Sequence, residues 1–147
     1  MSSKSVILDA KRTPIGSFLG ALSSFSASDL ASFVIKDILR NNKIDPVIIN
    51  EIILGNVLSG GQGQAPARQA ALKGGCLNSI ESLTINKMCG SGLKSVMLAD
   101  QTIRCGDADF ILAGGMESMS NAPHLFKNAR KGKKIGHNEI IDSMIHD

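Results

Sequence analysis

A strand-like run gives way to a helix-like segment at Ile85-Asn86-Lys87-Met88-Cys89-Gly90-Ser91-Gly92. Residues 82–86 predict a strand, and the apolar spacing over 90–104 predicts a helix. Cys89 would then lie at the first turn of that helix, where backbone N–H groups and the helix dipole favour a thiolate. The glycines beside it would let another molecule approach the sulfur closely. Position alone leaves two interpretations open, a nucleophile and a buried small hydrophobe.

Short β-like runs alternate with helix-like segments on both sides of this corner. Further strands are expected at 5–8, 51–58 and 109–113. Ser28 and Asp29 can cap a helix that carries one apolar stripe, made of Leu30, Ala31, Val34, Ile35, Ile38 and Leu39. Another helix is expected over 65–73, stopped by two glycines. This alternation predicts an α/β domain with crossover connections.

Composition excludes several broad classes of protein. The 147 residues are 43% hydrophobic and 20% charged, which fits one globular domain or a large piece of one. No apolar run approaches the roughly 20 residues of a membrane-spanning helix. The net charge of +3 and the absence of Trp and Tyr argue against nucleic-acid binding. We therefore expect neither a membrane nor a nucleic acid as partner.

The cysteine pattern indicates reduced thiols and no metal site. Cys76, Cys89 and Cys105 form no CxxC pair and have no histidine at metal-ligand spacing. Apolar residues follow the first methionine almost at once, so no signal peptide is expected. These features predict a cytoplasmic protein. Cys76 and Cys105 are interpreted as structural residues.

Other candidate groups have ordinary explanations. Lys87 could favour a neighbouring thiolate, but a solvated lysine is the simpler interpretation. The Gly60–Gly63 loop lacks the lysine and hydroxyl of a phosphate-binding loop. His124, His137 and His146 have no spacing relation to Cys89 that would mark a base. After Met119 the periodicity ends, and a basic cluster between Lys127 and Lys134 indicates a solvated loop that could also attract a polyanion.

Five motifs together carry a family resemblance. They are Ala10-Lys11-Arg12-Thr13-Pro14-Ile15-Gly16-Ser17-Phe18, Gly55-Asn56-Val57-Leu58, Gly63-Gln64-Ala65-Pro66-Ala67-Arg68-Gln69, Asn86-Lys87-Met88-Cys89-Gly90-Ser91-Gly92 and Ala113-Gly114-Gly115-Met116-Glu117-Ser118-Met119-Ser120. In this order they resemble the N-terminal half of a thiolase, above all the bacterial-type biosynthetic acetyl-CoA acetyltransferases. The resemblance implies a half-domain of layered helices and mixed sheet over 1–118, and over 119–147 the truncated start of the thiolase loop region.

The resemblance also implies a reaction. Cys89 would take an acetyl group from acetyl-CoA as a thioester, and a second acetyl-CoA would then be condensed to acetoacetyl-CoA, or the reverse. The backbone N–H of Cys89 would form part of an oxyanion hole. Coenzyme A thioesters would be substrates, with no permanently bound cofactor and no metal. The residues that bind coenzyme A are not assigned.

The sequence departs from the thiolase pattern in its missing partners. It has no Asn-Glu-Ala-type, Gly-His-Pro or Cys-x-Gly motif, which in the family supply an asparagine, a base and a proton shuttle. We therefore expect no turnover from the chain alone, and a C-terminal thiolase half in cis or trans that completes both fold and site. Complete family members are usually homodimers or homotetramers.

Three other functions stay open. One is a degradative 3-ketoacyl-CoA thiolase, and another is a noncatalytic thiolase remnant that serves as an oligomerisation module. The third is a redox sensor that uses Cys89, which the chain disfavours because no resolving cysteine lies at suitable spacing.

Overall fold

The computed structural model of the protein describes residues 4–132 and 135–146. Its main sheet has three strands in the order β2-β1-β3, namely β1 (Glu51–Gly55), β2 (Glu81–Ile85) and β3 (Ile111–Gly115). Both strand pairings are parallel, and Gly55 lies level with Ile85 on one side and Gly115 on the other. The carboxyl ends of the three strands therefore meet at one edge of the sheet.

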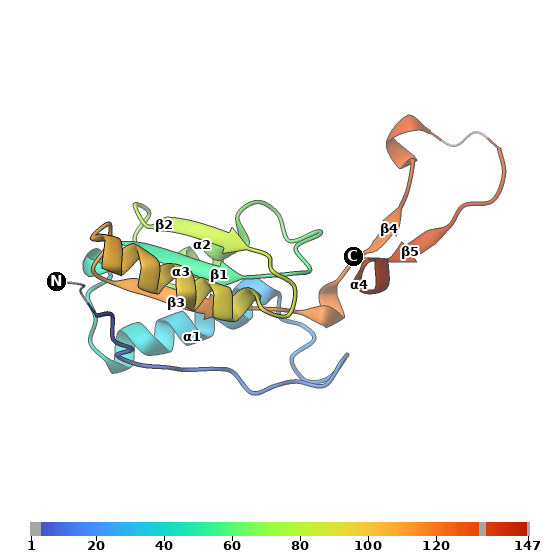
Figure 1. Ribbon diagram of the computed structural model, residues 1–147. Helices are drawn as coiled ribbons and strands as arrows, with labels where there is room; N and C mark the ends of the chain where they lie inside the picture. The colour runs from blue at the N-terminus through green and yellow to red at the C-terminus, as the bar shows by residue number, and fades with distance from the viewer. Residues whose placement is uncertain (1–3, 133–134, 147) are drawn as a thin grey trace.

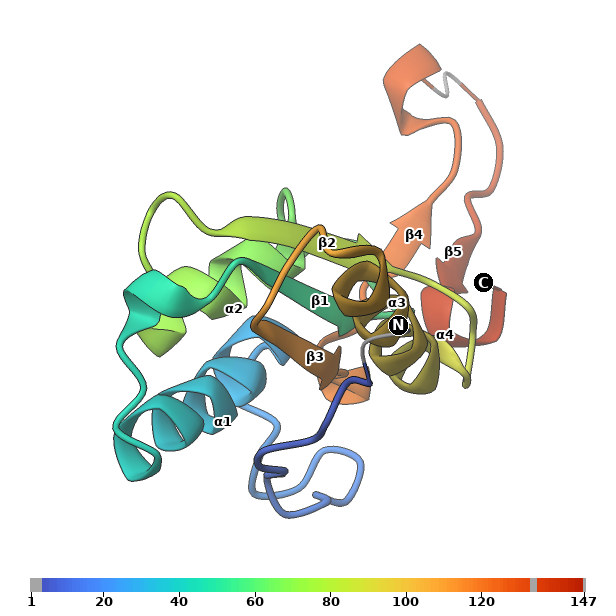
Figure 2. The same ribbon diagram turned by 60° about the vertical axis from the view of Figure 1, so that its left-hand side comes forward.

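Helices cover both faces of this sheet, as Figures 1 and 2 show. Helices α1 (Ala27–Asn41) and α2 (Pro66–Gly74) lie on one face, and α3 (Ser91–Cys105) lies on the other. Parallel strands joined through helices are the arrangement that the alternating sequence pattern predicts. The α/β class is thus confirmed.

The main core lies between the sheet and the pair α1 and α2. Its buried members come from the central strand, from both helices and from residues that flank the strands, namely Ala27, Ala31, Ile35, Leu39, Ile49, Ile52, Leu54, Ala67, Ala70, Ala71, Cys76, Ile80 and Met116. The two helices approach so closely that a Cβ on Gly74 would lie 2.6 Å from Ile35 Cγ2. Ile53 is also buried, and the alternation of side chains along a strand directs it to the α3 face.

Helix α1 begins earlier than the sequence indicates. Its N-cap is Ser26, whose hydroxyl accepts a hydrogen bond from the Asp29 N–H while the Asp29 carboxylate accepts one from the Ser26 N–H. The prediction of Ser28 as a cap is therefore wrong. Ser28 lies inside the first turn, where its hydroxyl accepts a hydrogen bond from Lys73 of α2 at 2.9 Å.

Helix α3 presents small residues to the sheet. Its buried positions are Ser91, Ser95 and Ala99, spaced four residues apart. Ser95 Oγ donates a hydrogen bond to the carbonyl oxygen of Gly114 on β3, at 2.6 Å. The larger apolar residues of this helix point away from the sheet, and Leu93 is 69% exposed. The helix therefore lies close to the strands and leaves an apolar outer face.

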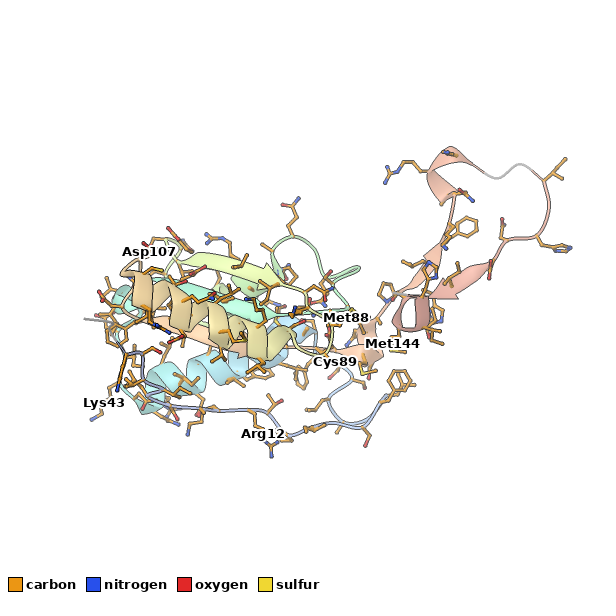
Figure 3. All side chains as sticks on the ribbon, viewed as in Figure 1. Arg12, Lys43, Met88, Cys89, Asp107 and Met144 are labelled. Carbon is orange, nitrogen blue, oxygen red and sulfur yellow. The ribbon has the colours of Figure 1, made fainter. Side chains whose placement is uncertain are left out.

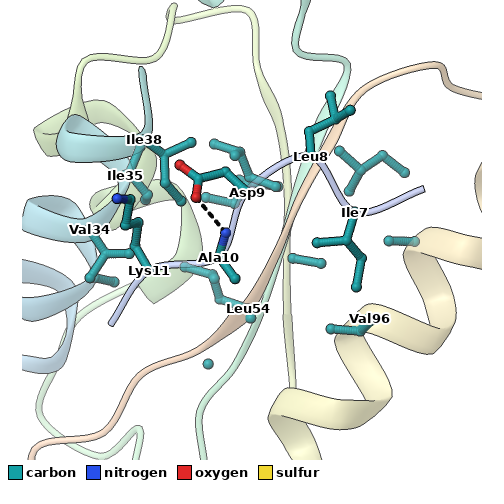
Figure 4. Close-up of a pocket in the computed structure, with 18 of the residues that line it drawn as sticks. Ile7, Leu8, Asp9, Ala10, Lys11, Val34, Ile35, Ile38, Leu54 and Val96 are labelled. Carbon is teal, nitrogen blue, oxygen red and sulfur yellow. Dashed lines mark hydrogen bonds between the residues drawn. The ribbon is translucent and has the colours of Figure 1, made fainter. Parts of the chain in front are cut away.

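The segment before α1 does not form the strand predicted over 5–8. It is extended but unpaired, and Ile7 is 80% exposed. Side chains tie it to the helices, since the Ser5 hydroxyl donates to Asp100 of α3 and Asn42 donates to Asp9. A groove of about 690 Å³ is lined by this segment, α1, α3 and β3 (Figure 4). Its apolar residues Val6, Ile7 and Leu8 are exposed, and within the described chain the segment has no backbone partner beside the groove at the free edge of β3.

Predicted strand ends shift by a few residues elsewhere. The strand expected over 51–58 ends at Gly55, because the N–H groups of Val57 and Leu58 donate to the Glu117 carboxylate instead of a neighbouring strand. Short 3₁₀ turns lie at Pro46–Ile48, at Met119–Asn121 and, between β4 and β5, at Ala129–Lys131.

The residues after Met119 include a small hairpin unit, although Ser120 and Asn121 are hydrogen-bonded to the segment before α1. Strands β4 (His124–Phe126) and β5 (Ile140–Asp142) pair antiparallel, and the short helix α4 (Ser143–His146) follows. The hairpin projects away from the layers in Figure 1. The division at 118/119 and the role of 119–147 as the start of a loop region stay predictions. Across the described ranges, no helix combines the length and apolarity needed to cross a bilayer.

Candidate active site

Cys89 lies at the corner between β2 and α3, as the sequence predicts, but it precedes the helix N-cap Gly90 and is not part of the first turn. Its thiol is exposed and unpaired with any other cysteine. Figure 3 shows Met88 and Cys89 together at one end of the layers, far from Lys43 and Asp107 at the other. Because β2 runs into the corner and α3 leaves it, the thiol stands at the carboxyl ends of the strands, next to the amino end of a 15-residue helix.

Two side chains hold the corner in a strained shape. Met88 has φ +48°, a left-handed conformation that side chains other than glycine rarely adopt. The Asn86 carboxamide oxygen accepts a hydrogen bond from the Met88 N–H at 2.9 Å. Ser91 Oγ accepts one from the Lys87 N–H at 2.8 Å and donates one to the Met88 carbonyl at 2.6 Å. The residue before the cysteine is therefore fixed from both sides.

Glycines allow the first turn of α3 to lie directly against the strand ends. A Cβ on Gly55 would be 2.5 Å from the Ser91 carbonyl carbon and 2.7 Å from the Gly92 nitrogen. A Cβ on Gly115 would be 3.3 Å from Gly92 Cα. Side chains at these positions would push the helix away, so the glycine content of the quoted motifs has a steric cause here.

A hollow of about 300 Å³ lies beside the thiol. Three glycines are among the residues that line it, which are Gly55, Val57, Met88, Cys89, Ser91, Gly92, Gly115, Met116 and Glu117. An exposed sulfur beside such a hollow can be reached by an electrophilic carbonyl group, and helix N–H groups nearby can stabilise negative charge.

Glu117 is a site residue that the sequence interpretation missed. Its carboxylate accepts hydrogen bonds from Asn56 Nδ2 at 2.6 Å, the Val57 N–H at 2.9 Å and the Leu58 N–H at 3.1 Å. It therefore ties the turn after β1 to the end of β3, next to Cys89. The available signal was an acidic residue two positions after the strand end at Gly115, but its partners lie about 60 residues away in the chain.

The other two cysteines occupy unrelated places. Cys76 belongs to the main core, and burial raises the pKa of its thiol. Cys105 is exposed as the last residue of α3. The structure thus separates the three thiols, and Cys89 is the one that lines the hollow described above.

The remaining candidates do not converge on Cys89. Lys87 is exposed, and His124, His137 and His146 are exposed residues of the unit after Met119. His146 Nε2 lies 2.9 Å from Lys127 Nζ. Within residues 4–132 and 135–146, no histidine lines the hollow. Of the basic cluster, Lys127, Arg130 and Lys131 are exposed, whereas Lys133 and Lys134 lie outside the described residues.

An α/β layer structure with an exposed cysteine at a strand-to-helix corner defines a class of candidate thiol enzymes. The model of the "Thiolase, N-terminal domain" family matches residues 5–147, and the chain belongs to this family. The resemblance seen in the sequence motifs is therefore confirmed. The thiolase family is one of acyltransferase enzymes.

Similar proteins come from bacteria and a plant. The chain is 49% identical over 142 residues to "Probable acetyl-CoA acetyltransferase" of Escherichia coli, which covers 97% of this chain and 36% of that protein. It is 52% identical over 145 residues to "Probable acetyl-CoA acyltransferase" of Staphylococcus epidermidis, covering 99% and 37%. "Acetyl-CoA acetyltransferase 2" of Arabidopsis thaliana is 50% identical over 141 residues, covering 96% and 35%. The chain spans little more than a third of the length of these curated relatives.

Proposed function

We propose that Cys89 is the acyl-accepting nucleophile of an acetyl-CoA C-acetyltransferase. Its thiolate attacks the carbonyl carbon of acetyl-CoA, a carbon-sulfur bond forms to Cys89, and coenzyme A leaves as a thiolate that takes up a proton. The enolate of a second acetyl-CoA then attacks the thioester, which releases the Cys89 thiolate and acetoacetyl-CoA. The reverse sequence cleaves acetoacetyl-CoA. Sulfur suits both steps because it is a strong nucleophile and a good leaving group.

One observation carries this proposal: the exposed Cys89 thiol lies at the amino end of α3 beside the hollow. A thioester carbonyl that reaches the sulfur would occupy this hollow, whose lining includes Gly55, Gly92 and Gly115. We assign the backbone N–H of Cys89 to the oxyanion hole, since charge that develops on the carbonyl oxygen would lie near the helix amino end. The names of the relatives support coenzyme A thioesters as substrates.

We assign the remaining acid and base groups to a C-terminal thiolase half. Proton transfer at the α-carbon needs a base within hydrogen-bond reach, and the hollow, as described, is lined by no histidine. Two surfaces support a C-terminal thiolase half that packs here in cis or trans. They are the apolar outer face of α3 and the 690 Å³ groove beside the free edge of β3. On this proposal the complete protein forms homo-oligomers, as its family does, and acts in the cytoplasm without a bound cofactor.

The proposal has one alternative that concerns the length of the acyl chain that the enzyme accepts. Names of the relatives include both acetyltransferase and acyltransferase, so a degradative 3-ketoacyl-CoA thiolase is the alternative within the same chemistry. A noncatalytic remnant would keep the fold and the outer surfaces but would have no use for an accessible thiol in a hollow. The exposed position of Cys89 favours the enzyme.

Acyl transfer to the chain tests the proposal. The protein is incubated with acetyl-CoA, quenched in acid and digested, and acetyl groups are located by mass spectrometry. We expect acetylation of Cys89 in the unchanged chain and in Cys105→Ala, and none in Cys89→Ala. We expect no acetoacetyl-CoA cleavage by the chain alone, and cleavage after it is mixed with the remaining two thirds of the Escherichia coli relative. A Cys89 that stays unacetylated while alkylating reagents modify it would refute the proposal.

A further inference from the structure

We infer that Glu117 is a positioning residue for the hollow beside Cys89, a role that builds on the function proposed above. Glu117 follows β3, whereas the turn that it holds, Asn56–Leu58, follows β1. The two strands are neighbours with Gly55 and Gly115 in register, so both strands end at the same level of the sheet. The Met116 N–H also donates to the Gly55 carbonyl at 2.9 Å, which brings Glu117 directly against the turn.

The carboxylate is matched to its partners by charge and by hydrogen-bond type. One oxygen accepts from Asn56 Nδ2 and the Leu58 N–H, and the other accepts from the Val57 N–H. All three partners are donors. A glutamine in either flip state would direct its own N–H₂ group at one or two of these donors, so a neutral side chain of the same shape cannot replace the carboxylate.

Asn56 connects the Glu117 carboxylate to the loop after β1 through further hydrogen bonds. It is 2% exposed, and its Nδ2 also donates to the Met116 carbonyl at 3.3 Å. Its Oδ1 accepts from Gln62 Nε2 at 3.3 Å, and the same Gln62 group donates to the Leu58 carbonyl at 2.6 Å. Gln69 of α2 then donates to the Gln62 carbonyl at 2.8 Å. The turn is therefore fixed on both of its sides, with Glu117 at the end nearest Cys89.

These hydrogen bonds between Glu117 and the turn Asn56–Leu58 determine the shape of the hollow. Val57, Met116 and Glu117 line the hollow together with Met88, Cys89 and Ser91. If the carboxylate is lost, the N–H groups of Val57 and Leu58 lose their acceptor, and an unpaired N–H in a partly buried place is unfavourable. The turn should then move outward and take Val57 away from the thiol. The hollow would widen while the thiol itself stays exposed.

The test compares Glu117→Gln with Glu117→Asp, and with Glu81→Gln as an exposed carboxylate at the opposite end of the sheet. The rate of acetyl transfer from acetyl-CoA to Cys89 is measured, together with iodoacetamide labelling of all three cysteines and amide hydrogen exchange at Val57 and Leu58.

For Glu117→Gln we expect acetyl transfer slower by about 10- to 100-fold, because the acyl group is no longer held against the sulfur. Iodoacetamide labelling of Cys89 should stay within about twofold, because this small reagent needs no shaped hollow. Exchange at Val57 and Leu58 should accelerate. Glu117→Asp keeps both acceptors and should recover part of the rate, and Glu81→Gln should match the unchanged chain.

Buried Cys76 separates positioning from general unfolding, because its labelling rises only when the core opens. If Glu117→Gln opens the core, the same comparison is made with Glu117→Asp, for which we then expect slower acetyl transfer and faster exchange at Val57 and Leu58 at unchanged Cys76 labelling. Unchanged acetyl transfer or unchanged exchange in the folded variant would overturn the inference. If even the unchanged chain takes no acetyl group, the proposed function fails by itself, and exchange at Val57 and Leu58 alone then decides whether Glu117 holds the turn.

Discussion

Gly55, the last residue of β1, lies so close to Ser91, the first residue of α3, that a Cβ on Gly55 would approach the Ser91 carbonyl carbon to 2.5 Å. Real Cβ atoms do not come this near to backbone atoms. The strand end and the helix start therefore determine each other's position, and Cys89 is two residues away from the contact.

Gly55→Ala should destabilise the fold and displace the cysteine. Because backbone on both sides cannot yield easily, we expect a loss of about 1–3 kcal/mol in the free energy of unfolding, as for an overpacked core. Gly114→Ala is the matched control, since a Cβ there would make only an ordinary 3.9 Å contact with Leu54, and we expect a change of about 0.5 kcal/mol or less. Urea unfolding measures both variants. Equal stabilities for the two would show that α3 can shift freely.

Met88→Gly should not destabilise the protein, although glycine usually does. The left-handed φ of +48° costs a residue with a side chain about 1–2 kcal/mol, which glycine avoids, and the loss of chain entropy offsets part of that gain. Met97→Gly is the matched control, because Met97 is also half-exposed but lies inside α3, where glycine costs about 1 kcal/mol. Thermal melts should rank Met88→Gly above Met97→Gly, and the reverse order would argue against strain at the corner.

Iodoacetamide should modify Cys89 faster than Cys105, and both far faster than Cys76. Cys89 and Cys105 are exposed, but one lies at the amino end of α3 and the other at its carboxyl end, where the helix dipole opposes a thiolate. Burial both hides Cys76 and raises the pKa of its thiol. Peptide mass spectrometry at neutral pH gives the three rates, and denatured protein serves as the control in which they converge. A Cys105 that reacts as fast as Cys89 in the folded chain would contradict an activated nucleophile.

Asp29 should make stability depend on pH in the acid range. Its pKa is lowered to about 2, first by the Lys73 ammonium 2.6 Å from Oδ1 and then by the Ser26 hydroxyl. Because the folded pKa lies below the unfolded value of about 3.9, the stabilisation is complete above that pH and is lost as pH falls toward 2. The melting temperature of Asp29→Asn should therefore approach that of the unchanged chain between about pH 4 and pH 2.

Lys73→Met provides the control for this pH effect. Without the ammonium group the Asp29 pKa returns toward its usual range, so the stability lost through Asp29→Asn should be smaller at pH 6 in the Lys73→Met background. The pair is partly exposed, which keeps the effect modest. A stability loss that is independent of pH would show that Asp29 acts only through its place in the helix cap.

Local signals in the sequence were sufficient to predict the strand and the helix on either side of Cys89. A strand over 82–86 and a helix from Gly90 agree with β2 and α3 to within a residue, because alternation, helical spacing and the glycine stop at Gly106 are all properties of neighbouring residues. The cap at Ser26 was missed because three polar residues close together, Ser26, Ser28 and Asp29, could each serve, and only the geometry of the first turn selects one.

Long-range relationships could not be predicted in the same way. The hydrogen bond from Asn56 to Glu117 joins residues 61 positions apart, and no pattern within either segment indicates the other. The run over 5–8 has the composition of a strand, but whether it pairs depends on what lies beside it, and here it flanks the groove next to β3. The role of Cys89 itself came from the ordered motifs of the family and stays a proposal.

The Ser95 hydroxyl, one turn beyond Ser91, links α3 to β3. Its 2.6 Å hydrogen bond to the Gly114 carbonyl resists both translation of the helix along β3 and rotation about its own axis, since either motion would carry the hydroxyl out of reach. The height of the Cys89 sulfur above the strand ends is therefore set partly by a residue that never meets the hollow. A small displacement of this helix would therefore change the distance between the Cys89 sulfur and the turn that Glu117 holds, although every residue that lines the hollow stays the same.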